Sequence, residues 1–237
     1  KLIIRAGVGV DNIAVPYAEA AGIQVRNTPR ASSNAVAELA LALLFSCARN
    51  ISIAGHTMRE NKWEKKAYSK GFELSGKTMG VVGYGRIGSL VGQKAQALGM
   101  NVLSYVNRHK PEGCECDTMH FVSPDEVFAQ SDVIVLCAPG SGRPIVDAES
   151  LAKMKDGVVI VNVSRGANVD EAALLDALNS GKVKAAGLDV WMSEKDPNWG
   201  LAQHPAVSCT PHIGAGTKEA QKRIGAELVD IIEHFEA

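Results

Sequence analysis

Short apolar runs alternate with longer segments of helical periodicity through the middle of this sequence. The runs are rich in β-branched residues and short enough to be buried strands, and the segments between them repeat apolar positions three and four residues apart. This alternation predicts a doubly wound α/β fold, in which helices cover both faces of a parallel sheet. The expected strands are 79–82, 102–106, 132–139, 157–166 and 185–191, and the expected helices are a segment ending at 98, 124–129, 148–154 and 171–179.

The two ends of the chain are expected to form a second domain. A predicted strand over 2–7 leads into a glycine-rich turn and a short helix, and the chain ends in an amphipathic helix. We therefore expect a central domain over 28–214 and a discontinuous domain made of 1–27 and 215–237. Because the sequence starts inside a strand, we expect the second domain to be truncated at its N-terminus.

A long apolar helix ending at Arg49 is followed by a charged segment over 51–75 that carries Trp63, Tyr68 and Phe72. Such a segment is too polar for a core, yet its aromatic rings favour burial. Together the helix and the segment predict a homodimer interface.

Composition excludes several classes of partner. Charged residues make up 22% of the chain and the net charge is −1, which does not indicate binding to nucleic acid or to an anionic membrane. The longest apolar run, 35–48, is too short to span a bilayer. Five cysteines without framework spacing are typical of a reduced, cytoplasmic protein. Cys114, Cys116 and His120 have no fourth ligand at zinc-site spacing, so no metal site is predicted.

The turn after the first central strand has the pattern G-x-G-x-x-G, at Gly83, Gly85 and Gly88. The first glycine permits a sharp turn, the second lets a pyrophosphate approach the backbone, and the third lets the helix pack against the sheet. The N–H groups at the start of that helix then face the phosphates. With a strand before it, and a helix and a second strand after it, the pattern predicts a dinucleotide cofactor.

The residues at the end of the second strand bear on the choice of cofactor. NAD-specific sites usually have an acidic residue there, which accepts hydrogen bonds from the ribose 2′-hydroxyl. This sequence has no carboxylate there, and Arg108 with Asn107 could instead bind a 2′-phosphate. We therefore expect NADP(H), with NAD(H) held by other contacts as the alternative.

Three polar residues follow predicted strand ends or lie in a glycine-containing loop: Arg165, Glu194 and His212. Oxidation of a 2-hydroxy acid needs a cation that binds the substrate carboxylate and a group that exchanges a proton near neutral pH. A carboxylate beside an imidazole favours its charged form. Each residue could instead be an ordinary surface or loop residue, because sequence alone does not show whether they meet. Likewise, the turn after Arg5 could hold a carboxylate on its N–H groups or could simply end a strand.

Five segments resemble the D-isomer-specific 2-hydroxyacid dehydrogenase family, and together they cover nearly the whole chain. The segments are RAGVGVDNI, NTPRASSNAVAELALALL, GKTMGVVGYGRIG, NVSRGANVDEAALLDALNSGKVKAAGLDVW and TPHIGAGTKEAQ. The resemblance implies a Rossmann domain beside a substrate domain. It also implies hydride transfer between a nicotinamide cofactor and an (R)-2-hydroxy acid or its 2-oxo acid. RAGVGVDN and GTKEAQ are most similar to the members that oxidise 3-phosphoglycerate.

The resemblance further implies roles for individual residues. Arg165 would bind the carboxylate and carbonyl of the substrate, His212 would be the acid/base, and Glu194 its partner. Substrate contacts are also implied for Arg5, Val8 and Gly9. The implied cofactor contacts are Val8, Gly83, Gly85, Arg86, Ile87, Gly88, Asn107, Arg108, Ala138, Pro139, Val163, Ser164, Arg165, Asp189, His212, Gly214 and Ala215.

Besides the missing acidic residue after the second strand and the expected N-terminal truncation, two features depart from the family pattern, and two other functions compete. Lys195 follows Glu194 where the family has proline, and the loop GSGRP after Pro139 is shorter than usual. One alternative is an NADPH-dependent reductase of glyoxylate or hydroxypyruvate, which suits the expected cofactor. The other is a non-catalytic NAD(P)-sensing module, as in corepressor relatives of this fold. Convergence of Arg165, Glu194 and His212 would favour an enzyme.

Overall fold

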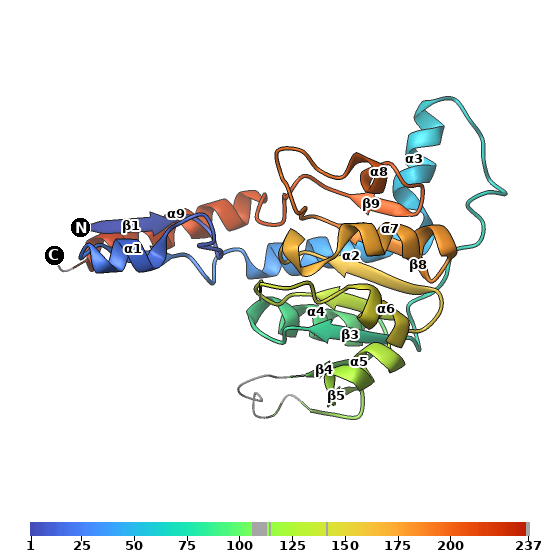
Figure 1. Cartoon of the computed structure of the whole chain (residues 1–237), viewed down its shortest axis with the longest axis horizontal. Helices are drawn as coiled ribbons and strands as arrows, with labels where there is room; N and C mark the ends of the chain where they lie inside the picture. Colours follow the sequence, from blue (N-terminus) through green and yellow to red (C-terminus); the bar gives the residue numbers. More distant parts are fainter. Residues whose placement is uncertain (106–112, 114, 141, 236–237) are drawn as a thin grey trace. The chain divides into compact units, whose positions relative to one another are not determined.

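A computed structural model describes the protein at residues 1–105, 113, 115–140 and 142–235. The chain divides into two compact units, and Figure 1 shows their elements in sequence colours. The larger unit is Glu38–His212, and the smaller unit combines Lys1–Ala37 with Ile213–Ala237. The sequence had suggested divisions after residues 27 and 214.

The larger unit is built on a seven-stranded parallel sheet with the order β5-β4-β3-β6-β7-β8-β9 (Figure 1). From β3 the chain moves outward to β5, then returns beside β3 and continues to the other edge. The predicted doubly wound fold is thereby confirmed. The strands are β3 (Thr78–Val82), β4 (Asn101–Tyr105), β5 (Met119–Phe121), β6 (Val133–Leu136), β7 (Val158–Asn162), β8 (Val183–Leu188) and β9 (Val207–Cys209).

Helices cover both faces of this sheet. On one face α5 (Pro124–Gln130), α6 (Ala148–Lys153), α7 (Glu171–Ser180) and α8 (Trp199–Ala202) pack each against the next. The other face is covered by α2 (Ser33–Arg49) and α4 (Arg86–Ala97). Neighbouring residues of β3 divide between the faces, since the α-carbon of Gly80 faces Val127 of α5 whereas Val81 packs under Gly88 of α4.

The central strands are buried on both faces, which explains their continuous apolar sequence. Every residue of β6 and of β7 is buried. A strand with helices on both sides has no solvent face, so it does not alternate apolar and polar residues. A hydrophobic core lies between these strands and the α5–α8 layer, and includes Ile134, Ile160 and Leu174.

The smaller unit contains both ends of the chain. Strand β1 (Leu2–Arg5) pairs in parallel with β2 (Gln24–Asn27), and α1 (Val15–Ala20) connects them. The C-terminal helix α9 (Lys218–Glu233) belongs to the same unit. Arg223 of α9 donates from Nε to the carbonyl of Ala31, in the N-terminal part of this unit, over 2.9 Å.

Some elements were not anticipated from sequence. The structure adds α3 (Ile51–Arg59), α8, and the edge strands β5 and β9, which have three residues each. The four-residue helix α8 and the three-residue strands β5 and β9 carry too few residues for a periodic pattern. Within the described residues no single helix is long and apolar enough to cross a membrane, although α2 and α3, bent at 69°, pass that test as a pair by length and composition.

Candidate active site

The glycine turn between β3 and α4 has a different steric demand at each glycine. Gly83 has φ +96°, and a Cβ added there would lie 2.5 Å from the backbone nitrogen of Ala138. A Cβ on Gly88 would lie 2.1 Å from the carbonyl oxygen of Gly83. A Cβ on Gly85, by contrast, would have no heavy atom within 4 Å among the described residues. The open space beside Gly85, at the N-terminus of α4, fits a dinucleotide pyrophosphate.

A cavity of about 1030 Å³ lies next to this turn, which is large enough for a cofactor. It sits where the strand order reverses between β3 and β6, the usual ligand position in such sheets. The cavity is lined by Gly83, Tyr84, Gly85, Tyr105, Pro124, Phe128, Ala138, Pro139, Gly140, Arg143, Pro144, Ile145, Asp147, Glu149, Ser150 and Lys153.

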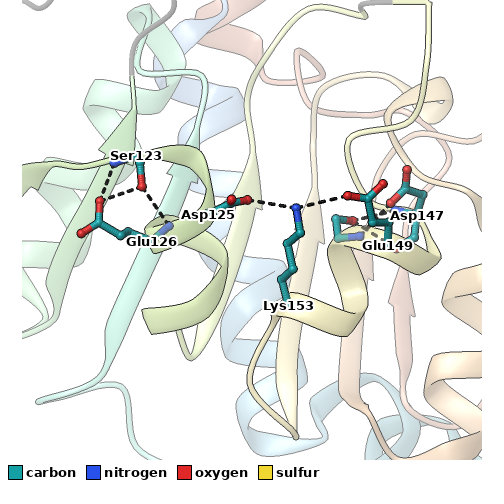
Figure 2. A network of polar contacts seen from close by, with 7 residues as sticks. Ser123, Asp125, Glu126, Asp147, Glu149 and Lys153 are labelled. Atoms are coloured by element: carbon teal, nitrogen blue, oxygen red, sulfur yellow. Dashed lines mark hydrogen bonds and ion pairs between the residues drawn. The ribbon is translucent and has the colours of Figure 1, made fainter.

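A network of polar contacts fixes the helices at the edge of this cavity (Figure 2). Lys153 of α6 lies between Asp125 of α5, at 3.1 Å, and Glu149, at 3.2 Å. Asp147 caps the start of α6 and accepts a hydrogen bond from the Ser150 N–H over 2.8 Å, which holds the pKa of Asp147 below its usual value. The ion pairs are exposed and add little stability. The pair between Lys153 and Asp125 joins α6 to α5 beside the cavity, whereas the pair between Lys153 and Glu149 lies within α6.

His212 and Glu194 are in direct contact, through a hydrogen bond between Nδ1 of the imidazole and Oε1 of the carboxylate. Both side chains are accessible, at 45% and 60% exposed, so a substrate can reach them. The backbone N–H of His212 donates to the carbonyl of Asp189 over 2.8 Å. Two of the three residues singled out from sequence are therefore brought together, in an arrangement suited to proton exchange.

Arg165 follows the end of β7 and is half-buried. Its Nη1 donates to the carbonyl of Ser164 over 2.7 Å, and its own carbonyl accepts from Asn162 Nδ2 over 2.8 Å. A Cβ on the next residue, Gly166, would lie 2.0 Å from the carbonyl oxygen of Trp191. The chain that carries Arg165 thus packs directly against the segment that leads to Glu194.

Buried amides hold the loop around Arg165. Asn162 Oδ1 accepts from Ser164 Oγ over 2.8 Å, and Asn168 Nδ2 donates to Ser164 Oγ and to the carbonyl of Ala138, each over 2.9 Å. Asn162 and Asn168 were not among the residues predicted from sequence. The available signal was a polar residue ending a buried strand, in the run NVSRGAN.

Asp189 follows β8 and is only 1% exposed. Its Oδ1 accepts a hydrogen bond from Thr210 Oγ1 over 2.6 Å. The Thr210 carbonyl in turn accepts from Trp191 Nε1 over 3.2 Å. Thr210, also missed from sequence, therefore joins the strand end at Asp189 to the loop that carries His212.

Residues 41–214 match the family described as D-isomer specific 2-hydroxyacid dehydrogenase, NAD binding domain. The chain belongs to this family. Hydroxypyruvate reductase of Thermotoga maritima is 49% identical over 238 residues, which cover 98% of this chain and 76% of that protein. D-3-phosphoglycerate dehydrogenase of Mycobacterium bovis is 42% identical over 98% of this chain, and the chain spans 44% of its length. The crystal structure of a glyoxylate reductase from Paecilomyes thermophila superimposes with a TM-score of 0.92 at 40% identity, covering 98% of this chain and 71% of that one.

Membership confirms the predicted family and an NAD-binding domain, and places the protein among oxidoreductases that act on CH–OH donors. In this dehydrogenase the implied cofactor contacts lie on several different elements. Arg86 and Ile87 begin α4, between Gly85 and Gly88, and Val163 is buried after β7. Asn107 and Arg108 lie outside the described residues.

The remaining implied residues of the dehydrogenase lie in its smaller unit. Arg5 ends β1, and the Gly7 N–H donates to its carbonyl over 2.9 Å. The carbonyl of Val8 accepts from Asn27 Nδ2 over 2.6 Å, which ties the turn before Gly9 to β2. Of the residues after His212, Gly214 is buried and Ala215 accepts from Gln221 Nε2 over 3.0 Å.

Metal chemistry has no candidate in the described part of the dehydrogenase. No group of three or more His, Cys, Asp or Glu side chains there could hold an ion. Cys114, considered with Cys116 and His120, lies outside the described residues. Burial raises the pKa of both Cys47 and Cys137 to about 12, so these thiols are poor ligands and poor nucleophiles.

Proposed function

We propose that the protein interconverts an (R)-2-hydroxy acid and its 2-oxo acid, with Arg165, Glu194 and His212 as the catalytic residues. The observation that carries this proposal is the contact between His212 and Glu194, two residues that lie far apart in the chain. A carboxylate paired with an accessible imidazole is suited to proton exchange and has no evident purpose in a module that only senses a nucleotide.

Each residue has a separate task in the proposed mechanism. Glu194 engages Nδ1 of His212, so the other ring nitrogen, Nε2, takes the proton from the substrate hydroxyl in oxidation and returns it in reduction. The guanidinium of Arg165 binds the substrate carboxylate and orients the C2 oxygen. Hydride exchange with C2 is the chemistry that the bound nicotinamide supplies.

We assign residues 28–214 to cofactor binding, and 1–27 with 215–237 to the substrate domain. The glycine turn and the adjoining cavity support the first assignment. The second is supported by the turn of Arg5, Val8 and Gly9, whose backbone N–H groups suit a carboxylate.

Two substrate classes have support. The motifs RAGVGVDN and GTKEAQ and the D-3-phosphoglycerate dehydrogenase of Mycobacterium bovis favour oxidation of 3-phosphoglycerate. The hydroxypyruvate reductase of Thermotoga maritima and the glyoxylate reductase from Paecilomyes thermophila favour reduction of a short 2-oxo acid. A panel of 2-oxo acids and 3-phosphoglycerate, assayed with each cofactor, separates the two.

Three finer properties belong to the same proposal. NADP(H) is favoured over NAD(H), because the sequence has Arg108 and no acidic residue at the end of β4. A homodimer is supported by exposed apolar side chains on α2, α3 and the segment after them. A cytoplasmic location is supported by the free thiols of all the described cysteines.

Replacing His212 and Arg165 tests the catalytic assignment. His212→Ala should lower kcat by roughly 10² to 10⁴, because the proton acceptor is lost. The cofactor Kd should stay nearly unchanged. Arg165→Ala should also raise KM, because the carboxylate loses its anchor in the ground state. Steady-state kinetics and cofactor titration give both quantities. His120→Ala, which removes an exposed histidine of β5, is the matched control. An unchanged kcat in His212→Ala would refute the mechanism.

A further inference from the structure

We propose that Glu171 is a positioning residue for the Glu194–His212 pair and acts through the backbone N–H of Met192. This inference rests on the proposed function and deepens it. Glu171 is the first residue of α7, and its Oε1 accepts a hydrogen bond from the Met192 N–H over 2.8 Å. The contact joins residues 21 positions apart, and one of them lies only two residues before Glu194.

Apolar packing does not fix the segment that carries Glu194. Residues 192–196 are all exposed, and the side chain of Met192 itself is 61% exposed. Trp191, immediately before them, is buried and donates from Nε1 to the carbonyl of Thr210. Since burial fixes the chain only as far as Trp191, polar contacts must fix the residues that follow.

The contacts inside the exposed segment differ in kind from the contact with Glu171. The Asp196 N–H donates to Ser193 Oγ over 3.2 Å, and Trp199 Nε1 donates to Asp196 Oδ1 over 3.2 Å. These bonds shape the loop locally. The bond from Met192 to Glu171 instead attaches the start of the loop to a helix of the core.

Glu171 also lies on the same short stretch as Arg165. Between them the chain forms a tight turn, in which the Asn168 N–H donates to the carbonyl of Arg165 over 3.1 Å and the Val169 N–H donates to that of Gly166 over 3.0 Å. One rigid stretch therefore carries both the proposed substrate-binding cation and the group that holds the loop of Glu194. Glu171 thereby sets the spacing between Arg165 and the Glu194–His212 pair.

A favourable interaction with the α7 helix dipole is the ordinary role of an acid at this position. Asp170, however, already caps the helix, because its Oδ1 accepts from the Ala172 and Ala173 N–H groups over 3.0 and 3.1 Å. The carboxylate of Glu171 reaches away from α7 to Met192. The two roles differ in their needs, since the dipole requires a negative charge whereas the Met192 N–H requires only an acceptor oxygen.

Two substitutions of Glu171 separate these roles. Glu171→Ala removes the acceptor and should lower kcat about tenfold, which is the loss expected for one hydrogen bond to a charged group. The change in KM should be smaller. Glu171→Gln keeps an acceptor oxygen and should stay within about threefold of wild type. Asp176→Ala removes an exposed acid from the same helix and should leave kcat unchanged. If Glu171→Gln loses as much activity as Glu171→Ala, the positioning role is overturned.

A double-mutant cycle with Glu194→Ala tests whether Glu171 acts through Glu194. If it does, adding Glu171→Ala to Glu194→Ala should reduce kcat by no more than about twofold further, because the loop then has no carboxylate to position. Losses that multiply would overturn the inference alone. If Glu194→Ala itself left kcat unchanged, both the inference and the proposed role of Glu194 would fail, so the two failures are distinguishable.

Discussion

His212 has a left-handed backbone, with φ 54°, which is uncommon for a residue with a side chain. Such a conformation costs on the order of 1 kcal/mol and persists where neighbouring contacts enforce it. Here the His212 N–H bonds to the carbonyl of Asp189, and the imidazole bonds to Glu194. The strained backbone is therefore held at both its amide and its side chain, which keeps the ring in one orientation.

Cofactor choice is also decided by single residues. Arg108→Asp should shift the ratio of kcat/KM for NADPH over NADH by at least about tenfold toward NADH, because a carboxylate repels the 2′-phosphate and accepts from the ribose 2′-hydroxyl. Arg108→Lys retains the positive charge and should keep the wild-type preference. The ratio is measured by steady-state kinetics with each cofactor. This role for Arg108 would be ruled out if the wild-type enzyme prefers NADH and Arg108→Asp leaves the ratio of kcat/KM for the two cofactors unchanged.

At the scale of secondary-structure elements, Asp132 joins the starts of two neighbouring strands. Just before β6, its Oδ2 accepts from the Thr78 N–H of β3 over 2.9 Å, and its Oδ1 pairs with Lys155 Nζ over 2.9 Å. Burial alone would raise the pKa of Asp132, but the hydrogen bond from Thr78 and the ion pair with Lys155 outweigh it and lower the pKa. The charged carboxylate therefore stabilises the folded state.

The lowered pKa of Asp132 predicts a pH-dependent loss of stability in Asp132→Asn. The stabilisation is complete above the unfolded-state pKa of about 3.9 and is lost as pH falls through the lower folded-state value. We expect Asp132→Asn to lower the free energy of unfolding by about 1 kcal/mol at pH 7, with a difference that shrinks below about pH 4. Urea unfolding at several pH values measures it. Asp156→Asn, at a carboxylate that is 92% exposed and pairs with Lys182, is the control and should have no measurable effect. A pH-independent loss of stability in Asp132→Asn would contradict the proposed role of Asp132.

At the scale of the whole molecule, exposed apolar side chains predict self-association. Phe45, Ile51, Met58 and Trp63 are 38%, 56%, 53% and 77% exposed on α2, α3 and the segment that follows. We expect light scattering to give a dimer at micromolar concentration, and Met58→Glu with Trp63→Glu to give a monomer, because a buried carboxylate without a partner opposes association. Tyr17→Glu, at an exposed ring of α1, should remain dimeric. A wild-type monomer would contradict the proposal.

The sequence by itself determined the elements whose signal is local. Strands β3, β4, β6, β7 and β8 were predicted because two-sided burial requires an unbroken apolar run. The glycine turn was predicted because close packing at Gly83 and Gly88 excludes any side chain. The three-residue strands β5 and β9 escaped prediction, because they are defined by pairing with β4 and β8 more than by their own residues.

Only the tertiary structure decided which polar residues meet. The sequence singled out Glu194 and His212 as separate candidates. Their contact arises because the C-terminal ends of strands β8 and β9 lie side by side in the parallel sheet. Glu171 looked like an ordinary acid at a helix start, and its bond to Met192 depends on how α7 packs beside the strand end at Asp189. Periodicity and glycine conformation depend on near neighbours in the chain, whereas contacts between distant residues depend on how whole elements pack, which no local pattern specifies.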